Sequence, residues 1–157
     1  MEHFVKFRIT DNDRHTYHPI SAICGEDYSL YLISNDKNDD KRNLFYSCKN
    51  NKPDSPLFVN THNLNPISIY GGLKNAAAIG DEGSILIIRA PCKSSSKYIT
   101  EKVKLPSNEK AVSIACCNKF IVVSSSSGFV YFSEINNEVD FDVKLVNFHK
   151  INSIEDH

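Results

Sequence analysis

Residues 66–88 read PISIYGGLKNAAAIGDEGSILII, and residues 111–133 read AVSIACCNKFIVVSSSSGFVYFS. The two stretches align without a gap at a constant shift along the chain, and each is a succession of short apolar or β-branched runs separated by turn-forming residues. This pattern is typical of strands joined by tight turns. The shift pairs Ile67 with Val112, Ser68 with Ser113, Gly83 with Gly128, Ile85 with Val130 and Ile87 with Phe132.

A third copy lies nearer the N-terminus, where residues 19–34 read PISAICGEDYSLYLIS. Its alignment with the middle copy matches Pro19, Ile20, Ser21 and Gly25 with Pro66, Ile67, Ser68 and Gly72. Self-similarity at this spacing indicates a repeat architecture. We therefore interpret residues 1–157 as a single repeat domain with units at roughly 17–60, 65–106 and 110–148. Residues 149–157 are a candidate opening of a further unit, because residues 151–154 resemble residues 20–23.

Within the middle unit we expect strands at residues 67–70, 76–79 and 84–88, with a hairpin turn at 81–83. A glycine two places after an aspartate supplies the positive φ that such turns need. The third unit repeats the pattern with strands at 120–124 and 129–133. In the first unit we expect a polar loop at 35–42 before a strand at 44–48.

Fourth strands are expected at residues 57–60, 99–105 and 141–146, and the last two alternate apolar with charged residues as an outer strand should. No stretch has a sustained helical period with caps, so the helix content should be very low. The sequence thus predicts an all-β fold of three four-stranded antiparallel, blade-like repeats that form a partial β-propeller.

We expect the core to come from the apolar residues of these strands. They are Ile20, Ile23, Leu30, Leu32, Ile67, Ile69, Ile79, Ile85, Ile87, Val112, Ile114, Val122, Val130 and Phe132.

Residues 112–123, VSIACCNKFIVV, followed by 128–131, GFVY, resemble the repeat of the RCC1 (regulator of chromosome condensation) family. That repeat runs V-x-x-I/V-A-x-G-x-x-H-x-L-A-L, then a D/E-G turn, then V-Y-x-W-G. Residues 23–30 and 72–83 resemble it too. The family's His is replaced here by Tyr28, Asn75 and Phe120, its Gly by Cys117 in the third unit, and the closing Trp-Gly is missing because the chain has no Trp. The resemblance implies propeller blades, in a family whose complete rings have more blades than three.

Composition narrows the possible partners and the compartment. Eighteen basic and nineteen acidic side chains leave a formal net charge of −1, which is not the basic footprint of a nucleic-acid binder. No apolar run approaches the length of a signal sequence or a membrane span. Five cysteines without regular spacing argue against a disulfide framework, so we expect reduced thiols and an intracellular protein, cytoplasmic or nuclear.

No residue pattern for chemistry stands out, and we expect no catalytic, cofactor-binding or metal-binding residues. His15 and His18 are the one histidine pair worth noting, and they have no compact ligand spacing with any cysteine. Cys116 and Cys117 are adjacent, so they should point to opposite faces of a strand, and core packing is the favoured interpretation. Neither a G-x-S-x-G elbow nor a phosphate-binding G-x-x-x-x-G-K-[ST] loop occurs.

These observations predict a non-catalytic protein–protein interaction module that binds partners at its loop-bearing ends. The resemblance implies a regulatory role in a GTPase-related or ubiquitin-related context. The alternative is an enzyme, a lyase or hydrolase, on a propeller-like scaffold, which would need a convergent cluster of acid, base or metal ligands. Because three blades cannot close a ring, we also expect self-association through open flanks that include Phe4, Phe7, Phe141 and Phe148.

Overall fold

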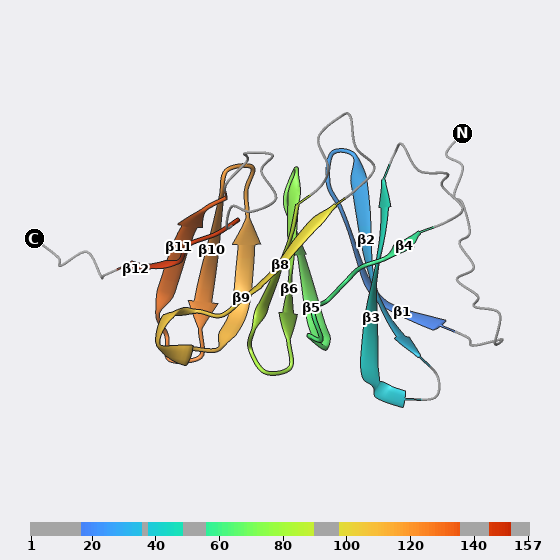
Figure 1. Cartoon of the computed structure of the whole chain (residues 1–157), viewed down its shortest axis with the longest axis horizontal. Coiled ribbons are helices and arrows are strands. Elements are labelled where there is room, and N and C mark those ends of the chain that lie inside the picture. The colour runs from blue at the N-terminus through green and yellow to red at the C-terminus, as the bar shows by residue number, and fades with distance from the viewer. Residues whose placement is uncertain (1–16, 36–37, 49–55, 90–97, 136–144, 152–157) are drawn as a thin grey trace, which may run out of the picture.

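The computed structural model describes residues 17–35, 38–48, 56–89, 98–135 and 145–151. These residues form three four-stranded sheets in which every pair of neighbouring strands is antiparallel (Figure 1). Apart from one short 3₁₀ turn, Pro106–Asn108, the described part of the chain has no helix. The predicted all-β architecture of three successive sheets is therefore confirmed.

The first sheet contains β1 (Tyr17–Cys24), β2 (Tyr28–Asn35), β3 (Asn38–Cys48) and β4 (Leu57–Phe58), in that order. The prediction of a polar loop at residues 35–42 is wrong, because most of these residues belong to β2 and β3. The β2–β3 ladder continues past Leu32 through the pairs Ser34–Arg42 and Asn35–Asn38. A two-stranded ribbon can extend into water with polar side chains, since its backbone groups hydrogen-bond to each other.

The other two sheets repeat this arrangement. The second contains β5 (Pro66–Gly71), β6 (Asn75–Gly80), β7 (Ile85–Arg89) and β8 (Ile99–Val103). The third contains β9 (Ala111–Cys116), β10 (Phe120–Ser125), β11 (Val130–Glu134) and β12 (His149–Ile151). Gly83 and Gly128 occupy the same place in the turns that follow β6 and β10, with φ of 77° and 82°. This positive φ is the conformation that the turn pattern predicted.

The fourth strand of the third sheet is not where the sequence placed it. β12 pairs with β11 through residues 149–151, which we had interpreted as the opening of a further unit. Of the stretch predicted as this strand, residues 141–144 lie outside the described residues. Leu145 and Val146 are buried together with Phe148 between the second and third sheets. Within the described residues, the predicted strand contributes one antiparallel bridge, between Val146 and Ile135, and two consecutive core residues.

The first strand of every sheet contains a β-bulge at the same position of the repeat. The strand registers skip one residue each time, namely Ile20 in β1, Ile67 in β5 and Val112 in β9. The three side chains are 46%, 43% and 52% exposed. A bulge inserts one extra residue into a strand, so the skipped residue leaves the alternation that would have buried it.

Four of the predicted core residues are exposed: the three bulged residues, and Val130 on the outer face of the third sheet. The bulges of the second and third sheets each accept a hydrogen bond from the preceding unit. The Arg42 guanidinium donates to the Ile67 carbonyl at 3.1 Å, and the Tyr70 hydroxyl donates to the Val112 carbonyl at 3.4 Å. Ile23, Val122 and Phe132 are half-buried. The predicted core residues that the structure buries are Leu30, Leu32, Ile69, Ile79, Ile85, Ile87 and Ile114.

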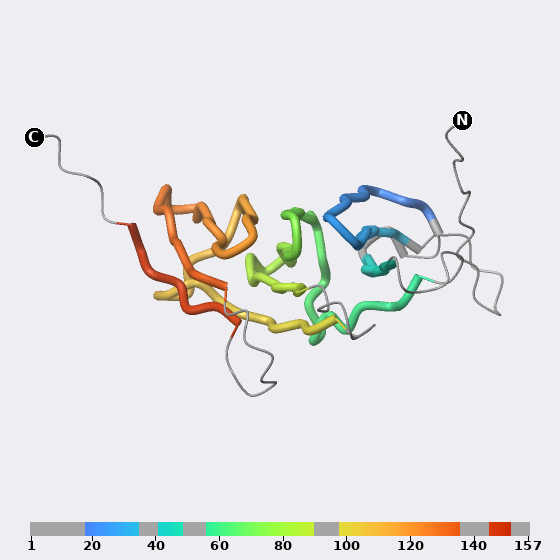
Figure 2. The backbone as a smooth tube through the Cα atoms, turned by 90° about the horizontal axis from the view of Figure 1, so that it is seen from above, coloured from blue at the N-terminus to red at the C-terminus, as the bar shows by residue number. Residues whose placement is uncertain are grey.

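The three sheets stand side by side (Figure 2). They bury two layers of apolar side chains between them. One layer joins the first and second sheets and includes Leu30, Leu44 and Leu86. The other joins the second and third sheets and includes Ile87 and Ile121. Alternation along β6 and β7 sends successive side chains to the two layers, which is why these strands are buried on both faces.

The two outer faces of the row differ. On the first sheet, Ile33 and Phe45 point away from the second sheet yet are only 3% and 9% exposed. On the third sheet, the face turned away from the second is partly open to water. Phe148, which we expected on an open flank, is buried, and Phe4, Phe7 and Phe141 lie outside the described residues. The open flank consists of Phe120, Val122, Val130, Phe132 and Ile151.

Candidate interaction surface at the hairpin corners

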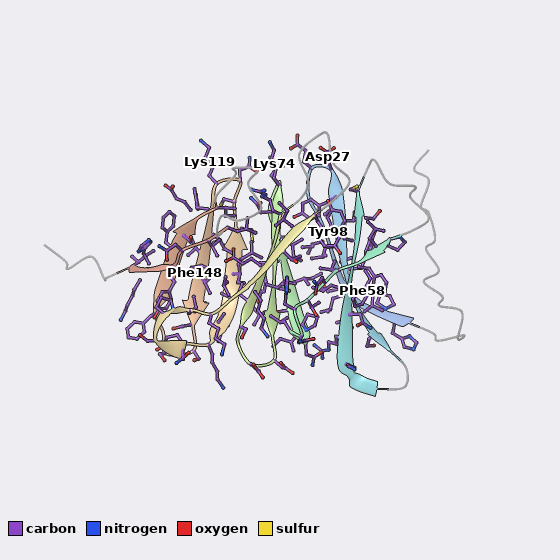
Figure 3. The ribbon with its side chains drawn as sticks, in the orientation of Figure 1. Asp27, Phe58, Lys74, Tyr98, Lys119 and Phe148 are labelled. Atoms are coloured by element: carbon purple, nitrogen blue, oxygen red, sulfur yellow. The ribbon has the colours of Figure 1, made fainter. Side chains whose placement is uncertain are left out.

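The first two strands of each sheet are joined by a tight corner, and the three corners lie at the same end of the molecule. They are residues 25–28, 72–75 and 117–120, which we call the corner surface. Asp27, Lys74 and Lys119 occupy equivalent places in the three units. Figure 3 shows them in a row along one edge of the molecule.

Tyr28 connects the first corner to the second. Its hydroxyl lies 2.8 Å from the carbonyl oxygens of both Gly72 and Asn75, to which it donates its hydrogen. The ring stacks on Tyr46, with centroids 5.9 Å apart. Burial raises the pKa of Tyr28 to about 12, so the hydroxyl remains a donor at neutral pH.

Asn75 repeats this connection one unit further along the chain. Its side-chain nitrogen donates to the carbonyl of Asn118 at 3.0 Å and to that of Cys117 at 3.4 Å. Asn75 is completely buried, and its side-chain oxygen has no hydrogen-bond partner. Phe120 holds the equivalent position in the third unit, where it is 40% exposed and has no group that could donate.

Backbone contacts hold the corners in register as well. The Glu26 amide donates to the Leu73 carbonyl at 2.8 Å. Gly72 lies so close to the third unit that a Cβ added there would be 2.8 Å from the Cys116 carbonyl oxygen. Only glycine allows this approach without a shift of the backbone. The three corners thus form one continuous and well-fixed surface.

The exposed side chains on this fixed surface differ from unit to unit. The first corner presents Glu26 and Asp27, the second Leu73 and Lys74, and the third Asn118, Lys119 and Phe120. Leu73 is 49% exposed and lies next to Lys74 at the second tip. A rigid scaffold with variable tips is how repeat proteins build recognition surfaces.

The residues that could have carried chemistry are not brought together. His18 is exposed on β1, His62 contacts the Thr100 hydroxyl at 3.0 Å, and His15 lies outside the described residues. Where the structure describes the chain, no group of three or more His, Cys, Asp or Glu side chains could hold a metal ion.

The cysteines behave differently from one another. Cys116 packs against the core, and burial raises the pKa of its thiol to about 12, whereas Cys117 is exposed on the corner surface. The core-packing interpretation is thus right for Cys116 and wrong for Cys117. Cys24 and Cys48 are free thiols, and Cys92 is outside the described residues. None of the described segments forms a helix long and apolar enough to cross a membrane.

Sequence reasoning did not identify the corner surface, although it held a usable signal. Tyr28, Asn75 and Phe120 replace one histidine of the RCC1 repeat, and two of the three replacements keep a hydrogen-bond donor. A donor retained at an aligned position would have indicated a contact that recurs between units. The variable residues next to it would then have been the candidate recognition residues.

Four-stranded antiparallel sheets, repeated side by side with equivalent bulges and corners, define a partial β-propeller with an RCC1-like fold. No protein-family model matches the chain, and no curated protein is similar to it in sequence. Solved structures share the fold. Human WBSCR16 aligns with a TM-score of 0.58 at 15% identity, over 83% of this chain and 37% of that one.

Prp20 from Saccharomyces cerevisiae, yeast RCC1, aligns in two further structures. The first comes from a study of the Prp20 crystal structure and of its binding to Gsp1p and histones. It gives a TM-score of 0.55 at 13% identity over 87% of this chain and 39% of that one. The second, with Kap60 bound, gives 0.53 at 14% identity over 75% and 32%. The chain thus spans well under half the length of the propellers it matches.

Proposed function

We propose that this chain is a non-catalytic protein-interaction module that binds another protein through the corner surface. The observation that carries the proposal is the contrast between a conserved geometry and a changing chemistry at the three tips. Tyr28 and Asn75 fix consecutive corners by the same kind of hydrogen bond, while Asp27, Lys74 and Lys119 vary the exposed charge.

The enzyme alternative has no comparable support. It needs acid, base or metal ligands that converge, and the described histidines are spread over β1, β12 and the segment before β5. The proposal also includes an intracellular location, cytoplasmic or nuclear, because the thiols on Cys24 and Cys117 are free and exposed. A GTPase-related or ubiquitin-related role is the narrower form that the RCC1-like fold suggests.

The test compares two sets of alanine substitutions at opposite ends of the molecule. The corner variant carries Asp27→Ala, Leu73→Ala and Lys119→Ala. The control variant carries Glu82→Ala, Lys110→Ala and Ser127→Ala, all exposed residues near the opposite hairpin end. Each protein is immobilised, and proteins retained from a cell extract are quantified by mass spectrometry. We expect a set of proteins retained by the native chain and the control variant and lost by the corner variant.

If the corner variant retains the same proteins as the native chain, the proposal is wrong. Purified Gsp1p and histones are the first defined probes, because Prp20 was studied with both. Binding of Gsp1p that the corner variant abolishes would support the narrower GTPase-related role. If the native chain and both variants bind Gsp1p equally well, Gsp1p contacts a surface other than the corner surface.

A further inference from the structure

The charges on the corner surface are divided between the units. The first tip carries two carboxylates, Glu26 and Asp27, whereas the second and third tips carry Lys74 and Lys119. All four side chains are exposed, and none of them forms an ion pair within the described residues. Two lysines at equivalent places on adjacent, hydrogen-bonded corners therefore present positive charge that nothing in the described chain neutralises.

Apolar surface lies beside this charge. Leu73 precedes Lys74 and is 49% exposed. Phe120 follows Lys119, but its ring lies against Phe132 on the open flank and belongs to that face. The exposed Leu73 side chain can bury part of a ligand, while the ammonium groups of the two lysines bind its carboxylates. Hydrophobic contact of this kind supplies affinity, and charge supplies orientation and selectivity.

From this arrangement we infer that the second and third corners bind an acidic protein segment with an apolar anchor, and that Glu26 and Asp27 repel it from the first corner. The inference rests on the proposed function and names the chemistry of its partner. The carboxylates of the first tip determine where an acidic ligand lies along the corner surface, because such a ligand gains affinity only over the second and third units. The same carboxylates disfavour the binding of nucleic acid. So do the net charge of −1 and the fact that the corner surface carries only two lysines.

The experiment measures fluorescence anisotropy of a labelled short peptide that contains glutamates around a single leucine. Three comparison peptides carry glutamine in place of glutamate, lysine in place of glutamate, or serine in place of leucine. We expect the glutamate–leucine peptide to bind best and to weaken with added salt. Lys74→Glu and Lys119→Glu should each reduce affinity about tenfold, whereas the exposed control Lys110→Glu should leave it unchanged.

Asp27→Lys gives the sharpest result, because it should raise the affinity about threefold by removing the repulsion and adding a cation. Equal binding of the glutamate and glutamine peptides, or loss of affinity in Asp27→Lys, would overturn the inference. So would tighter binding of a single-stranded oligonucleotide than of the acidic peptide. These outcomes leave the proposed function standing if the alanine corner variant still loses its partners. If the alanine corner variant keeps its partners, both the proposed function and this inference lose their basis.

Discussion

The Tyr28 hydroxyl and the Gly72 carbonyl oxygen lie 2.8 Å apart and join two consecutive units, although the two residues are more than forty positions apart in the chain. Between the next two units, the Asn75 side-chain amide donates to the carbonyl of Cys117, the counterpart of Gly72, at 3.4 Å and to that of Asn118 at 3.0 Å. The same position of the repeat therefore provides the donor, and the same corner provides the acceptor. This relationship makes the exposed tips a fixed surface rather than three independent loops.

Removing these donors should destabilise the fold. Tyr28→Phe removes the hydroxyl that donates to the Gly72 carbonyl, and Asn75→Ala removes the side-chain amide that donates to the third corner. We expect the free energy of unfolding to fall by about 1–3 kcal/mol in each case. Phe120→Tyr is the matched control, because this position contacts no following corner among the described residues. It should change stability by less than about 0.5 kcal/mol. Urea denaturation measures all three variants, and equal effects at the three positions would contradict the repeated role.

Stability should fall at alkaline pH. Burial raises the pKa of Tyr28 from 10.0 to about 12 and that of Cys116 from 9.0 to about 12, and it also raises the pKa of Tyr46. The unfolded chain therefore releases these protons at lower pH than the folded chain does. The stability that the protonated groups provide is fully present below about pH 9 and is lost as the pH rises toward 12.

The variant Tyr28→Phe separates the contributions to this alkaline loss. It removes one of the raised groups, so its free energy of unfolding should decline less steeply between pH 10 and 12 than that of the native chain. Thermal unfolding followed by circular dichroism at a series of pH values gives both curves. Parallel curves would mean that Tyr28 ionises equally well in the folded and unfolded chain.

Equivalent positions in the second and third units should differ in their sensitivity to truncation. Ile85 is completely buried between two sheets, whereas its counterpart Val130 is 38% exposed on the open flank. We expect Ile85→Ala to cost about 2–4 kcal/mol and Val130→Ala less than about 1 kcal/mol. The midpoint of urea denaturation reports the difference. Similar costs would show that the flank is covered in solution.

The open flank also predicts concentration-dependent association. Phe120, Val130 and Ile151 are each more than a third exposed on the same face of the third sheet. We expect the sedimentation coefficient to rise with protein concentration and the rise to disappear in Val130→Glu. A native monomer over the whole range would show that the flank is capped, and association that persists in Val130→Glu would assign it to another surface.

The repeat made much of this fold predictable, because strands, turns and corner glycines recur in aligned positions. Gly83 and Gly128 were placed correctly since their turns require a positive φ that few other residues adopt. The bulges could not be foreseen. Ile20, Ile67 and Val112 look like core residues in an alternating pattern, and a one-residue insertion into the ladder moves each of them to the surface.

The third unit's last strand and the corner surface depend on contacts between distant segments. Leu145 and Val146 end a stretch that alternates apolar with charged residues, yet both are buried between two sheets, and of the two only Val146 forms a β-bridge, with Ile135. The tips were predictable as turns, yet only the packing of the sheets brings Asp27, Lys74 and Lys119 into one row (Figure 3). Composition and periodicity contain no information on that packing.

A nuclear Overhauser experiment on the isotopically labelled chain tests the equivalence of the three units most directly. We predict cross-peaks between the Tyr28 ring and the protons of Gly72 and Asn75, and between the Asn75 side-chain amide and the protons of Asn118. Both sets should be present together, because Tyr28 and Asn75 hold the same position of the repeat and each donates to the corner of the following unit. If either set is missing while the strands themselves are formed, the corners do not make one surface and the account is wrong.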